Sequence, residues 1–452
     1  MNTNQLKATK MKTQFRNFTL NTGIILAIGI LTFMEAISLQ AQSHAATATD
    51  SADHRPWYDL GMMADPILDQ SLLFYMAMTW SGQADIGECL ETASRVNAAD
   101  PNSWAEEWTK TANRLLLVAE KAEKQNHKIS AGQAYLRAAT YFSAALHRHN
   151  NPKAQIVLDN TLAASKYFRK AVQLLGIPAE RVQIPYGNTT LPGYFFRSPF
   201  AKGKAPVLIV HQGRDGWAIH CKYIADAAIS RGYHCLLIDG PGQGEALRLQ
   251  GLPFRPDWEN VITPVVDYLI ARKDVDPNRI GLMGLSMGGA LAPRAAAYEK
   301  RIKVCVANPG VLSWPDIISG FLGQIDPQLT DLWKTDPVGF NSLIASISTQ
   351  VPLVDWGIRD MMWKHGVQTP AELMLQMQEY SNKDIVSKIT CRMLVMDGAA
   401  DEYSQGHDLF EALACQKEYM FFEASDPGLQ HCQVGAQASS SARLFDWLDD
   451  NL

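Results

Sequence analysis

The chain has 452 residues, which is enough for one large α/β domain together with an accessory domain. Hydrophobic residues make up 47% of the chain and charged residues 19%, a balance typical of an ordinary globular protein. The formal net charge of -5 at pH 7 offers no basic surface, so we expect no nucleic-acid partner.

The first 48 residues are predicted to be a leader outside the fold. An apolar run from Gly23 to Met34 is followed by small residues up to Ala48. Four basic residues precede the run: Lys7, Lys10, Lys12 and Arg16. This order is typical of a secretory signal peptide, and the run is shorter than the about 18 residues of a membrane span. We expect export to the periplasm or the medium, with no stable membrane span after cleavage; an uncleaved N-terminal anchor is the alternative.

Residues 49–178 carry a helical pattern and are predicted to form an N-terminal all-helical domain. Apolar residues recur at helical spacing after Trp104, over Ala131–His147 and over Pro152–Leu175. The sequence Gly176-Ile177-Pro178 then ends the helical pattern. The alanine-rich faces of these segments indicate close helix–helix packing.

Residues 179–452 show buried strands separated by helices. A hairpin over Val182–Tyr186 and Leu191–Phe196 is predicted to come first. Five buried strands are predicted after it: Val207–Val210, His234–Ile238, Ile280–Met283, Val304–Ala307 and Met393–Met396. This alternation predicts an α/β fold with a mostly parallel sheet flanked by helices. A longer helical stretch at about residues 310–389 is predicted to be an insertion in this domain.

The segment Gly284-Leu285-Ser286-Met287-Gly288-Gly289 lies between a predicted strand and a predicted helix, Ala290–Ala297. A serine between glycines at such a turn is the nucleophile elbow of α/β-hydrolases. The turn strains the serine backbone, so only small residues fit at Gly284 and Gly288. It also points a helix N-terminus at the negative charge that develops during acyl transfer. Ser286 is therefore the predicted nucleophile.

A serine nucleophile needs a histidine base that is itself oriented by a carboxylate. In α/β-hydrolases these residues follow in the order Ser, then Asp or Glu, then His. Asp401 comes several residues after the predicted strand Met393–Met396, where the acid belongs. Asp397 fits the turn better, and Glu402 is one residue out of phase, so Asp401 is the predicted acid.

The histidine is expected in a loop near the C-terminus. His431 follows the strand-like Tyr419–Phe422 and precedes the final predicted helix. The rival His407 follows the acid too closely and opens a helix. The neighbouring Cys432 is interpreted as a packed thiol, because no second base is evident for it. His431 is therefore the predicted base.

The oxyanion hole needs backbone N–H groups aimed at the developing charge. One is predicted to come from Met287, directly after the nucleophile. The other is predicted to come from the loop His211–Gly216, where glycine lets the backbone approach the substrate, and specifically from Gly213 and Arg214. The side chains of Arg214 and Asp215 are interpreted as a local ion pair.

A second glycine-rich segment is Asp239-Gly240-Pro241-Gly242-Gln243-Gly244-Glu245. It lacks the Lys-Ser/Thr pair of a phosphate-binding loop and the G-x-G-x-x-G spacing of a dinucleotide site. We interpret it as a tight turn at the carboxyl end of a strand, on the rim of the active site.

Seven cysteines are an odd number, and their positions do not form a disulfide framework. Cys235, Cys305 and Cys391 lie in apolar strand-like runs, where a thiol behaves as a small hydrophobe. One bridge among the other four stays open: Cys89, Cys221, Cys415 and Cys432. Because the spacings C-x-x-C and H-E-x-x-H are absent, we expect no metal site and no cofactor.

Taken together, these motifs resemble one branch of the α/β-hydrolase superfamily. The branch includes the 2,6-dihydroxypseudooxynicotine hydrolases and the fungal pigment-pathway hydrolases that shorten polyketides. The resemblance covers roughly residues 104–452. It rests on the Asp239–Glu245 turn, the Gly284–Gly289 elbow, the loop His431-Cys432-Gln433, and the helical segment with Trp104, Trp108 and Ala134–Tyr141.

The resemblance implies that Ser286, Asp401 and His431 form a catalytic triad and that the helical N-terminal domain is a cap over the site. It implies a small-molecule carbonyl substrate and, for part of the branch, hydrolysis of a carbon–carbon bond next to a carbonyl by a retro-Claisen type reaction. That reaction releases a carbanion-like group that must be protonated, and Asp316 in the insertion is the candidate proton donor. The oligomeric state stays open, with a homodimer as the candidate assembly.

Several alternatives remain at this point. Carbon–carbon cleavage and carboxylic-ester cleavage share the same acyl-enzyme, so the triad does not separate them. A peptidase similar to the prolyl-oligopeptidase relatives and an acyltransferase would use the same chemistry. A catalytically silent binding protein on the same fold is the alternative of a different class.

Overall fold

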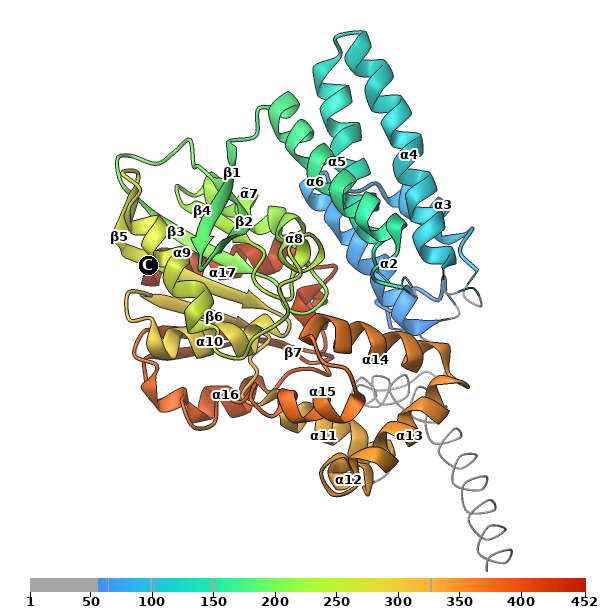
Figure 1. Cartoon of the computed structure of the whole chain (residues 1–452). Helices are drawn as coiled ribbons and strands as arrows, with labels where there is room; N and C mark the ends of the chain where they lie inside the picture. Colours follow the sequence, from blue (N-terminus) through green and yellow to red (C-terminus); the bar gives the residue numbers. More distant parts are fainter. Residues whose placement is uncertain are drawn as a thin grey trace, which may run out of the picture. The chain divides into compact units, whose positions relative to one another are not determined.

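The chain forms two compact units in the computed structural model (Figure 1). The residues that the structure describes are 56–63, 65–97, 100, 102–147, 149, 151–325 and 327–452. The larger unit holds the described residues up to Trp314, residues 363–366 and Glu379–Leu452, and the smaller unit holds residues 315–362 and 367–378. The predicted leader, residues 1–48, lies outside the described residues.

An eight-stranded sheet forms the centre of the larger unit (Figure 1). The strands are β1 (Ala179–Tyr186), β2 (Thr189–Phe196), β3 (Ala205–His211), β4 (His234–Ile238), β5 (Val275–Leu285), β6 (Val304–Asn308), β7 (Arg392–Gly398) and β8 (Lys417–Phe422). Their order is β1-β2-β4-β3-β5-β6-β7-β8. The pairs β1–β2 and β2–β4 are antiparallel, and the other neighbours are parallel. The predicted mostly parallel sheet is confirmed, and each predicted strand lies within an observed one.

Helices cover both faces of this sheet, which explains why β3, β4 and β6 are buried along their whole length. Figure 1 shows α9 (Glu259–Ile270) and α10 (Gly288–Tyr298) on one face, and α7 (Lys222–Ser230) and α17 (Gln437–Asn451) on the other. Four short elements lie between strands: η2 (Ala218–Cys221), α8 (Gly244–Arg248), η3 (Val386–Lys388) and α16 (Gly406–Ala412). Two more, η4 (Pro427–Leu429) and η5 (His431–Gln433), lie between the last strand and α17.

The region before the sheet is helical, as its periodicity predicts. Its elements are α2 (Pro66–Ala77), η1 (Met78–Ser81), α3 (Ile86–Ala93), α4 (Ser103–Lys124), α5 (Lys128–Ala144) and α6 (Gln155–Leu175). The carboxylate of Asp65 caps α2, because it accepts hydrogen bonds from the N–H groups of Ile67 and Leu68. Helix α6 ends at Gly176, whose φ of 64° is the left-handed conformation that glycine favours.

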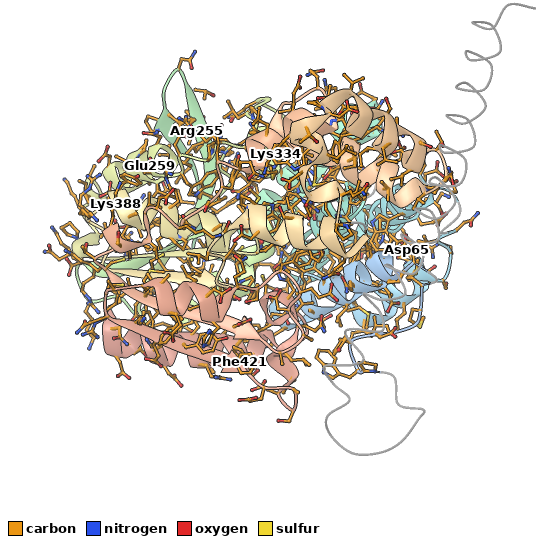
Figure 2. All side chains as sticks on the ribbon, turned by 90° about the horizontal axis from the view of Figure 1, so that it is seen from below. Asp65, Arg255, Glu259, Lys334, Lys388 and Phe421 are labelled. Carbon is orange, nitrogen blue, oxygen red and sulfur yellow. The ribbon has the colours of Figure 1, made fainter. Side chains whose placement is uncertain are left out.

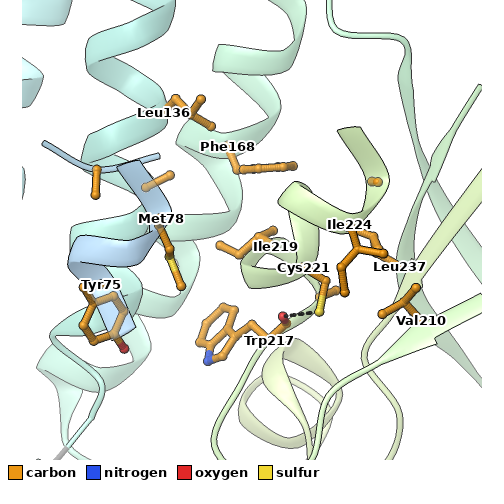
Figure 3. Close-up of a cluster of buried hydrophobic side chains, with 14 of the residues drawn as sticks. Tyr75, Met78, Leu136, Phe168, Val210, Trp217, Ile219, Cys221, Ile224 and Leu237 are labelled. Atoms are coloured by element: carbon orange, nitrogen blue, oxygen red, sulfur yellow. Dashed lines mark hydrogen bonds between the residues drawn. The ribbon is translucent and has the colours of Figure 1, made fainter. Parts of the chain in front are cut away.

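These helices and the sheet share one continuous hydrophobic core. Figure 3 shows part of it, where Met78 and Phe168 of the helical region lie beside Trp217 and Ile219 of the sheet region. The indole N–H of Trp104 is buried and donates to the carbonyl of Ala144 at 2.9 Å. The helical region is therefore packed as part of the larger unit, while the domain boundary at residue 178 stays a prediction.

The smaller unit contains α11 (Trp314–Ile325, from its second residue on), α12 (Leu329–Thr335), α13 (Pro337–Ser348), most of α14 (Pro352–His365), and α15 (Pro370–Met377). It has a core of its own, built from Trp333, Phe340, Ile344, Ile347, Ala371 and Met374. Thr369 and Glu372 form a capping box that fixes the start of α15.

Three further features of the described residues concern exposed lysines, free cysteines and the apolar character of the helices. Lys334 and Lys388 are exposed at the surface of their units (Figure 2). All seven cysteines are free, so the structure contains none of the bridges left open above. Among the described helices, none combines the length and the apolar character that a bilayer crossing requires.

Candidate active site

Ser286 lies at the sharp turn between β5 and α10, as the elbow motif predicts. Its φ of 59° is a left-handed conformation that a residue with a side chain rarely adopts. The turn is closed by the Ser286 N–H, which donates to the carbonyl of Asn308 at 2.7 Å. A Cβ atom on Gly284 would strike the carbonyl of Gly288, which explains why glycine is needed there. The strained turn therefore holds the serine hydroxyl in one place at the start of α10.

The structure brings Ser286, His431 and Asp401 together. Nε2 of His431 lies 2.9 Å from the Ser286 hydroxyl oxygen. Nδ1 of His431 lies 2.8 and 2.9 Å from the two carboxylate oxygens of Asp401. A carboxylate can only accept, so Nδ1 carries the proton and Nε2 is the acceptor that faces the serine hydroxyl. The three groups thus have the mutual geometry of nucleophile, base and orienting acid.

Asp401 lies in the loop after β7, and its side chain is fully buried. A backbone N–H also holds it, since Tyr403 donates to its Oδ1 at 3.0 Å. The rival acid Asp397 instead accepts hydrogen bonds from the hydroxyl of Tyr419 at 2.6 Å and from the N–H of Gly398. The carboxylate of Asp397 therefore makes hydrogen bonds at the end of β7, and the carboxylate of Asp401 is the one that contacts His431.

The charges around His431 favour its protonated form. Burial lowers the pKa of His431, but the carboxylate of Asp401 raises it more strongly in combination with Cys432, so the net pKa lies well above the ordinary value of 6.5. Desolvation and the nearby Asp401 raise the pKa of Glu402 to about 7. The pKa values of two groups at this site are therefore raised, that of His431 by neighbouring charges and that of Glu402 chiefly by burial.

Cys432, which the sequence led us to interpret as a packed thiol, makes polar contacts within this site. Its Sγ accepts a hydrogen bond from the Ser286 N–H at 3.1 Å and donates to the carbonyl of Asn308 at 3.3 Å. It lies 3.6 Å from Nε2 of His431. The thiol therefore links the elbow to the end of β6 through two hydrogen bonds, in addition to its packing contacts. Its position directly after the histidine was the only signal in the sequence.

The loop after β3 packs directly against the elbow. A Cβ atom on Gly213 would lie 2.5 Å from the Met287 nitrogen and 2.9 Å from Cβ of Ser286. Only glycine lets the backbone come this close. The structure thus brings the predicted oxyanion-hole residues Gly213 and Met287 together, with Arg214 next in the chain. Their role as donors stays a prediction.

The ion pair predicted for the neighbouring side chains is present and extends further than the sequence indicates. Nε of Arg214 lies 3.4 Å from Asp215. Nζ of Lys364 lies 2.6 Å from the other oxygen of Asp215, and the Lys364 side chain is only 3% exposed. Burial raises the pKa of Asp215, but Arg214 and Lys364 lower it by more, so that the carboxylate stays charged. Lys364 is 149 residues away in the chain, which is why no local motif reveals it.

Aromatic rings flank the histidine. The ring of Tyr403 packs edge-on against that of His431, with centroids 5.1 Å apart. Trp314 stacks on Tyr403 at 6.4 Å. The two aromatic side chains therefore support the loop that carries Asp401.

The remaining predicted site residue, Asp316, lies in the first turn of α11. This helix belongs to the smaller unit except for its first residue, so the role of Asp316 toward the larger unit stays a prediction. Within the described residues there is no group of three or more His, Cys, Asp or Glu side chains that could hold a metal ion.

Two family models match the chain. An esterase FrsA-like model matches residues 65–314. A model of the α/β hydrolase family matches residues 207–432. Together they span the helical region and the sheet.

Curated relatives and solved structures agree with these models. The hydrolase LUC6 of a Fusarium species is 33% identical over 390 residues, which is 81% of this chain and 92% of the relative. The 20-hydroxy-prefusarin hydrolase FUS2 of Gibberella moniliformis is 32% identical over 391 residues, or 81% of this chain and 92% of the relative. The crystal structure of the 2,6-dihydroxy-pseudo-oxynicotine hydrolase has the same fold, with a TM-score of 0.66, 22% identity, and coverage of 83% of this chain and 95% of that chain.

The models match at least half of the chain, and the two relatives exceed 30% identity over most of their own length. The fold, the order of the strands and these matches all lead to one assignment. The chain belongs to the α/β-hydrolase family and is a hydrolase.

Proposed function

We propose that the protein is a serine hydrolase that cleaves a small carbonyl compound through an acyl-enzyme on Ser286. The observation that carries the proposal is the continuous contact from the Ser286 hydroxyl through His431 to the buried Asp401, with distances of 2.9 and 2.8 Å. Serine is a weak nucleophile unless an oriented base removes its proton. This arrangement supplies such a base and holds it in the required tautomer.

The reaction follows from the positions of the groups. The Ser286 oxygen attacks the carbonyl carbon while Nε2 of His431 takes the hydroxyl proton. The carbonyl oxygen becomes an oxyanion, which the N–H groups of Met287 and of the Gly213–Arg214 loop stabilise. The bond to the leaving group then breaks, and its electron pair and the proton on His431 leave with that group. Water, deprotonated by His431, then attacks the acyl-enzyme. The bond between the acyl carbon and the Ser286 oxygen breaks, that oxygen takes the proton back from His431, and the carboxylic acid departs.

The bond that is cleaved is a carboxylic ester or the carbon–carbon bond of a ketone. The family model named for an esterase favours the first. The resemblance to the branch that hydrolyses carbon–carbon bonds next to a carbonyl favours the second, and a 20-hydroxy-prefusarin hydrolase is among the relatives. In the second case the leaving group is a carbanion that takes a single proton, and Asp316 is our candidate for the acid that supplies it in place of His431. His431 then releases its proton to solvent before it activates water, and Asp316 regains one from solvent.

The test compares both bond types in the same enzyme. Hydrolysis of a series of short p-nitrophenyl esters and of an aryl β-diketone is measured for the wild type, for Ser286→Ala and for Ser94→Ala. We expect Ser286→Ala to lose about 10⁵–10⁶-fold in kcat on every substrate that the wild type cleaves. Ser94 is an exposed serine at the end of α3, so its variant should match the wild type.

Each result has a definite meaning. Turnover of the esters alone would make the protein an esterase, and efficient cleavage of the diketone would make it a carbon–carbon hydrolase. Activity that survives in Ser286→Ala would overturn the proposal. If no substrate is turned over by a folded wild type and Ser286 fails to react with a fluorophosphonate, a binding role on the same fold replaces it.

We also propose that the enzyme acts outside the cytoplasm. The support is the leader-like order of basic residues, apolar run and small residues within residues 7–48. Expression with and without residues 1–48, followed by fractionation, tests this. Export that needs these residues supports the proposal, and equal retention of both forms in the cytoplasm contradicts it.

A further inference from the structure

One side chain of the glycine-rich turn at residues 239–245, that of Gln243, makes hydrogen bonds to the oxyanion loop. The side-chain nitrogen of Gln243 donates hydrogen bonds to the carbonyls of Gln212 and Gly213, the latter at 3.3 Å. Its side-chain oxygen accepts a hydrogen bond from the Gly240 N–H at 2.9 Å. Because the nitrogen faces two carbonyls and the oxygen faces an N–H, the contacts fix the orientation of the amide. The side chain is 1% exposed, so water does not compete for these contacts.

Holding these two carbonyls also fixes two N–H groups. In a trans peptide the C=O of one residue and the N–H of the next point in opposite directions within one rigid plane. The carbonyl of Gln212 shares its peptide with the Gly213 N–H, and the carbonyl of Gly213 shares its peptide with the Arg214 N–H. With both carbonyls turned toward Gln243, both N–H groups must turn away from it. These are the two N–H groups of the loop that the sequence assigns to the oxyanion hole.

Gln243 helps to close its own turn through the Gly240 N–H, but a second side chain also closes it. Asp239 closes the turn by accepting hydrogen bonds from the Ala218 N–H at 2.7 Å and from the Glu245 N–H at 3.0 Å. A Cβ atom on Gly213 would lie 2.5 Å from the Met287 nitrogen, so the peptides that Gln243 holds lie directly against the elbow. The position of Gln243 therefore bears on the loop beside the nucleophile as well as on its own turn.

We infer that Gln243 is a positioning residue for the oxyanion hole, which acts by keeping the Gln212–Gly213 and Gly213–Arg214 peptides from flipping. A flipped peptide would present a carbonyl oxygen to the developing negative charge in place of an N–H, and would repel it. The inference rests on the proposed function, since it concerns how that acyl transfer is stabilised. It assigns a purpose to the Asp239–Glu245 turn that the sequence alone did not reveal.

The test uses two variants and a matched control. Gln243→Met keeps the length of the side chain and removes the donor. Gln243→Glu keeps the acceptor for Gly240 and places an oxygen against the two carbonyls. Gln83→Met is the control, because Gln83 is equally buried and also donates to one backbone carbonyl, that of Ile219 at 2.9 Å. Folding of each variant is checked by its thermal midpoint.

The decisive measurement is kcat on an ester and on the matching thionoester, in which sulfur replaces the carbonyl oxygen. Sulfur accepts hydrogen bonds weakly, so a working oxyanion hole prefers the oxygen ester. We expect Gln243→Met to lower kcat on the ester about 10²-fold with little change in KM, and to reduce the ratio of ester to thionoester rates by a similar factor. Gln83→Met should leave that ratio at the wild-type value even if its thermal midpoint falls.

The second variant keeps the inference testable if Gln243→Met does not fold. As the pH falls, the activity of Gln243→Glu relative to the wild type at the same pH should rise, because a protonated carboxyl regains one donor. A folded Gln243→Met or Gln243→Glu with the wild-type ratio of rates would overturn the inference. The proposed function fails separately, when Ser286→Ala retains activity, so the two failures are distinguishable.

Discussion

Two sides of one candidate site differ in how they are built. On the proton-transfer side, Ser286, His431 and Asp401 meet through their own side chains, in the chain order that this family uses. On the proposed oxyanion side, we expect the loop at residues 212–215 to act through its backbone, and side-chain contacts from Gln243 and Lys364 support it. The first side could be predicted from the sequence, whereas the supports of the second could not.

The difference has a physical cause. A group that reacts through its side chain must be one of a few residue types, and the turn that presents it has its own sequence requirements. A backbone N–H is present in almost every residue, so only the glycine that permits close approach marks it. The side chains that hold such a loop can come from anywhere in the chain. Their identity follows from the fold and from no local motif.

The largest effect on kcat is expected from a substitution on the proton-transfer side, Asp401→Asn. This substitution should also change the pH dependence, which a substitution on the oxyanion side should not. Asp401→Asn cannot hold His431 in the required tautomer, and we expect kcat to fall about 10⁴-fold. It also removes the charge that raises the pKa of His431. The base works only when neutral, so wild-type activity should fall as the pH drops through a midpoint above 6.5, and this midpoint should move to lower pH in the variant. The pH profile of kcat/KM measures both.

A control addresses the second group that titrates here. Glu402, with its pKa raised to about 7, could produce a similar limb in the profile. We expect Glu402→Gln to keep the limb and most of the activity. Loss of the limb in that variant, with the limb retained in Asp401→Asn, would contradict the assignment of Asp401 as the acid partner of His431.

A smaller effect is expected on the oxyanion side. Lys364→Met leaves Asp215 without its buried partner, and we expect a loss of about 2 kcal/mol in the free energy of unfolding. The loop next to Gly213 loses a constraint, so kcat should fall about tenfold, by analogy with a partly misplaced oxyanion donor. The midpoint of the pH profile should not move, because the His431–Asp401 contact is untouched. Denaturant unfolding and the same pH series measure these quantities.

The matched control is Lys334→Met, which removes an ion pair of 3.1 Å with Asp331 in which both side chains are more than half exposed. Its cost in the free energy of unfolding should stay below about 1 kcal/mol, and kcat should not change. A shift of the pH midpoint in Lys364→Met would show that the two sides are not independent.

The smallest effect is expected where the two sides meet, at Cys432. Cys432→Ala removes one of two contacts of the Ser286 N–H, and the shorter contact, to the carbonyl of Asn308 at 2.7 Å, remains. The loss of one such hydrogen bond is about 1 kcal/mol, so we expect kcat to fall no more than about fivefold. Steady-state rates measure it, with Cys415→Ala as the control. A loss of 10²-fold or more would mean that the thiol takes part in the chemistry.

The sequence predicted features that depend on local patterns, and it failed where a feature depends on the folded structure. The strands around the elbow and the acid were predicted because short, wholly apolar runs are typical of strands buried on both faces. Strand β5 begins at Val275, five residues earlier than predicted. The prediction missed this part because Asp276, Pro277 and Asn278 are residues typical of turns. Asn102 directly precedes α4, but its side chain makes no capping hydrogen bond, so its residue type does not account for the start of this helix.

The contacts that could not be predicted join distant residues. Lys364 meets Asp215, and Asn308 meets Gln433 across 125 residues of chain at 2.8 Å. Such pairs depend on the final packing of loops around the sheet. Periodicity and motif spacing describe only neighbours in the sequence, so they contain no information on these contacts.

The most direct test of the account is the site of covalent labelling. The folded wild type is treated with a fluorophosphonate, digested, and analysed by peptide mass spectrometry, beside His431→Ala and Gln243→Met. The account predicts one phosphonyl group on Ser286 in the wild type, slower labelling of the same residue in Gln243→Met, and almost none in His431→Ala. Labelling of another residue, or equal rates of labelling of Ser286 in all three proteins, would contradict it.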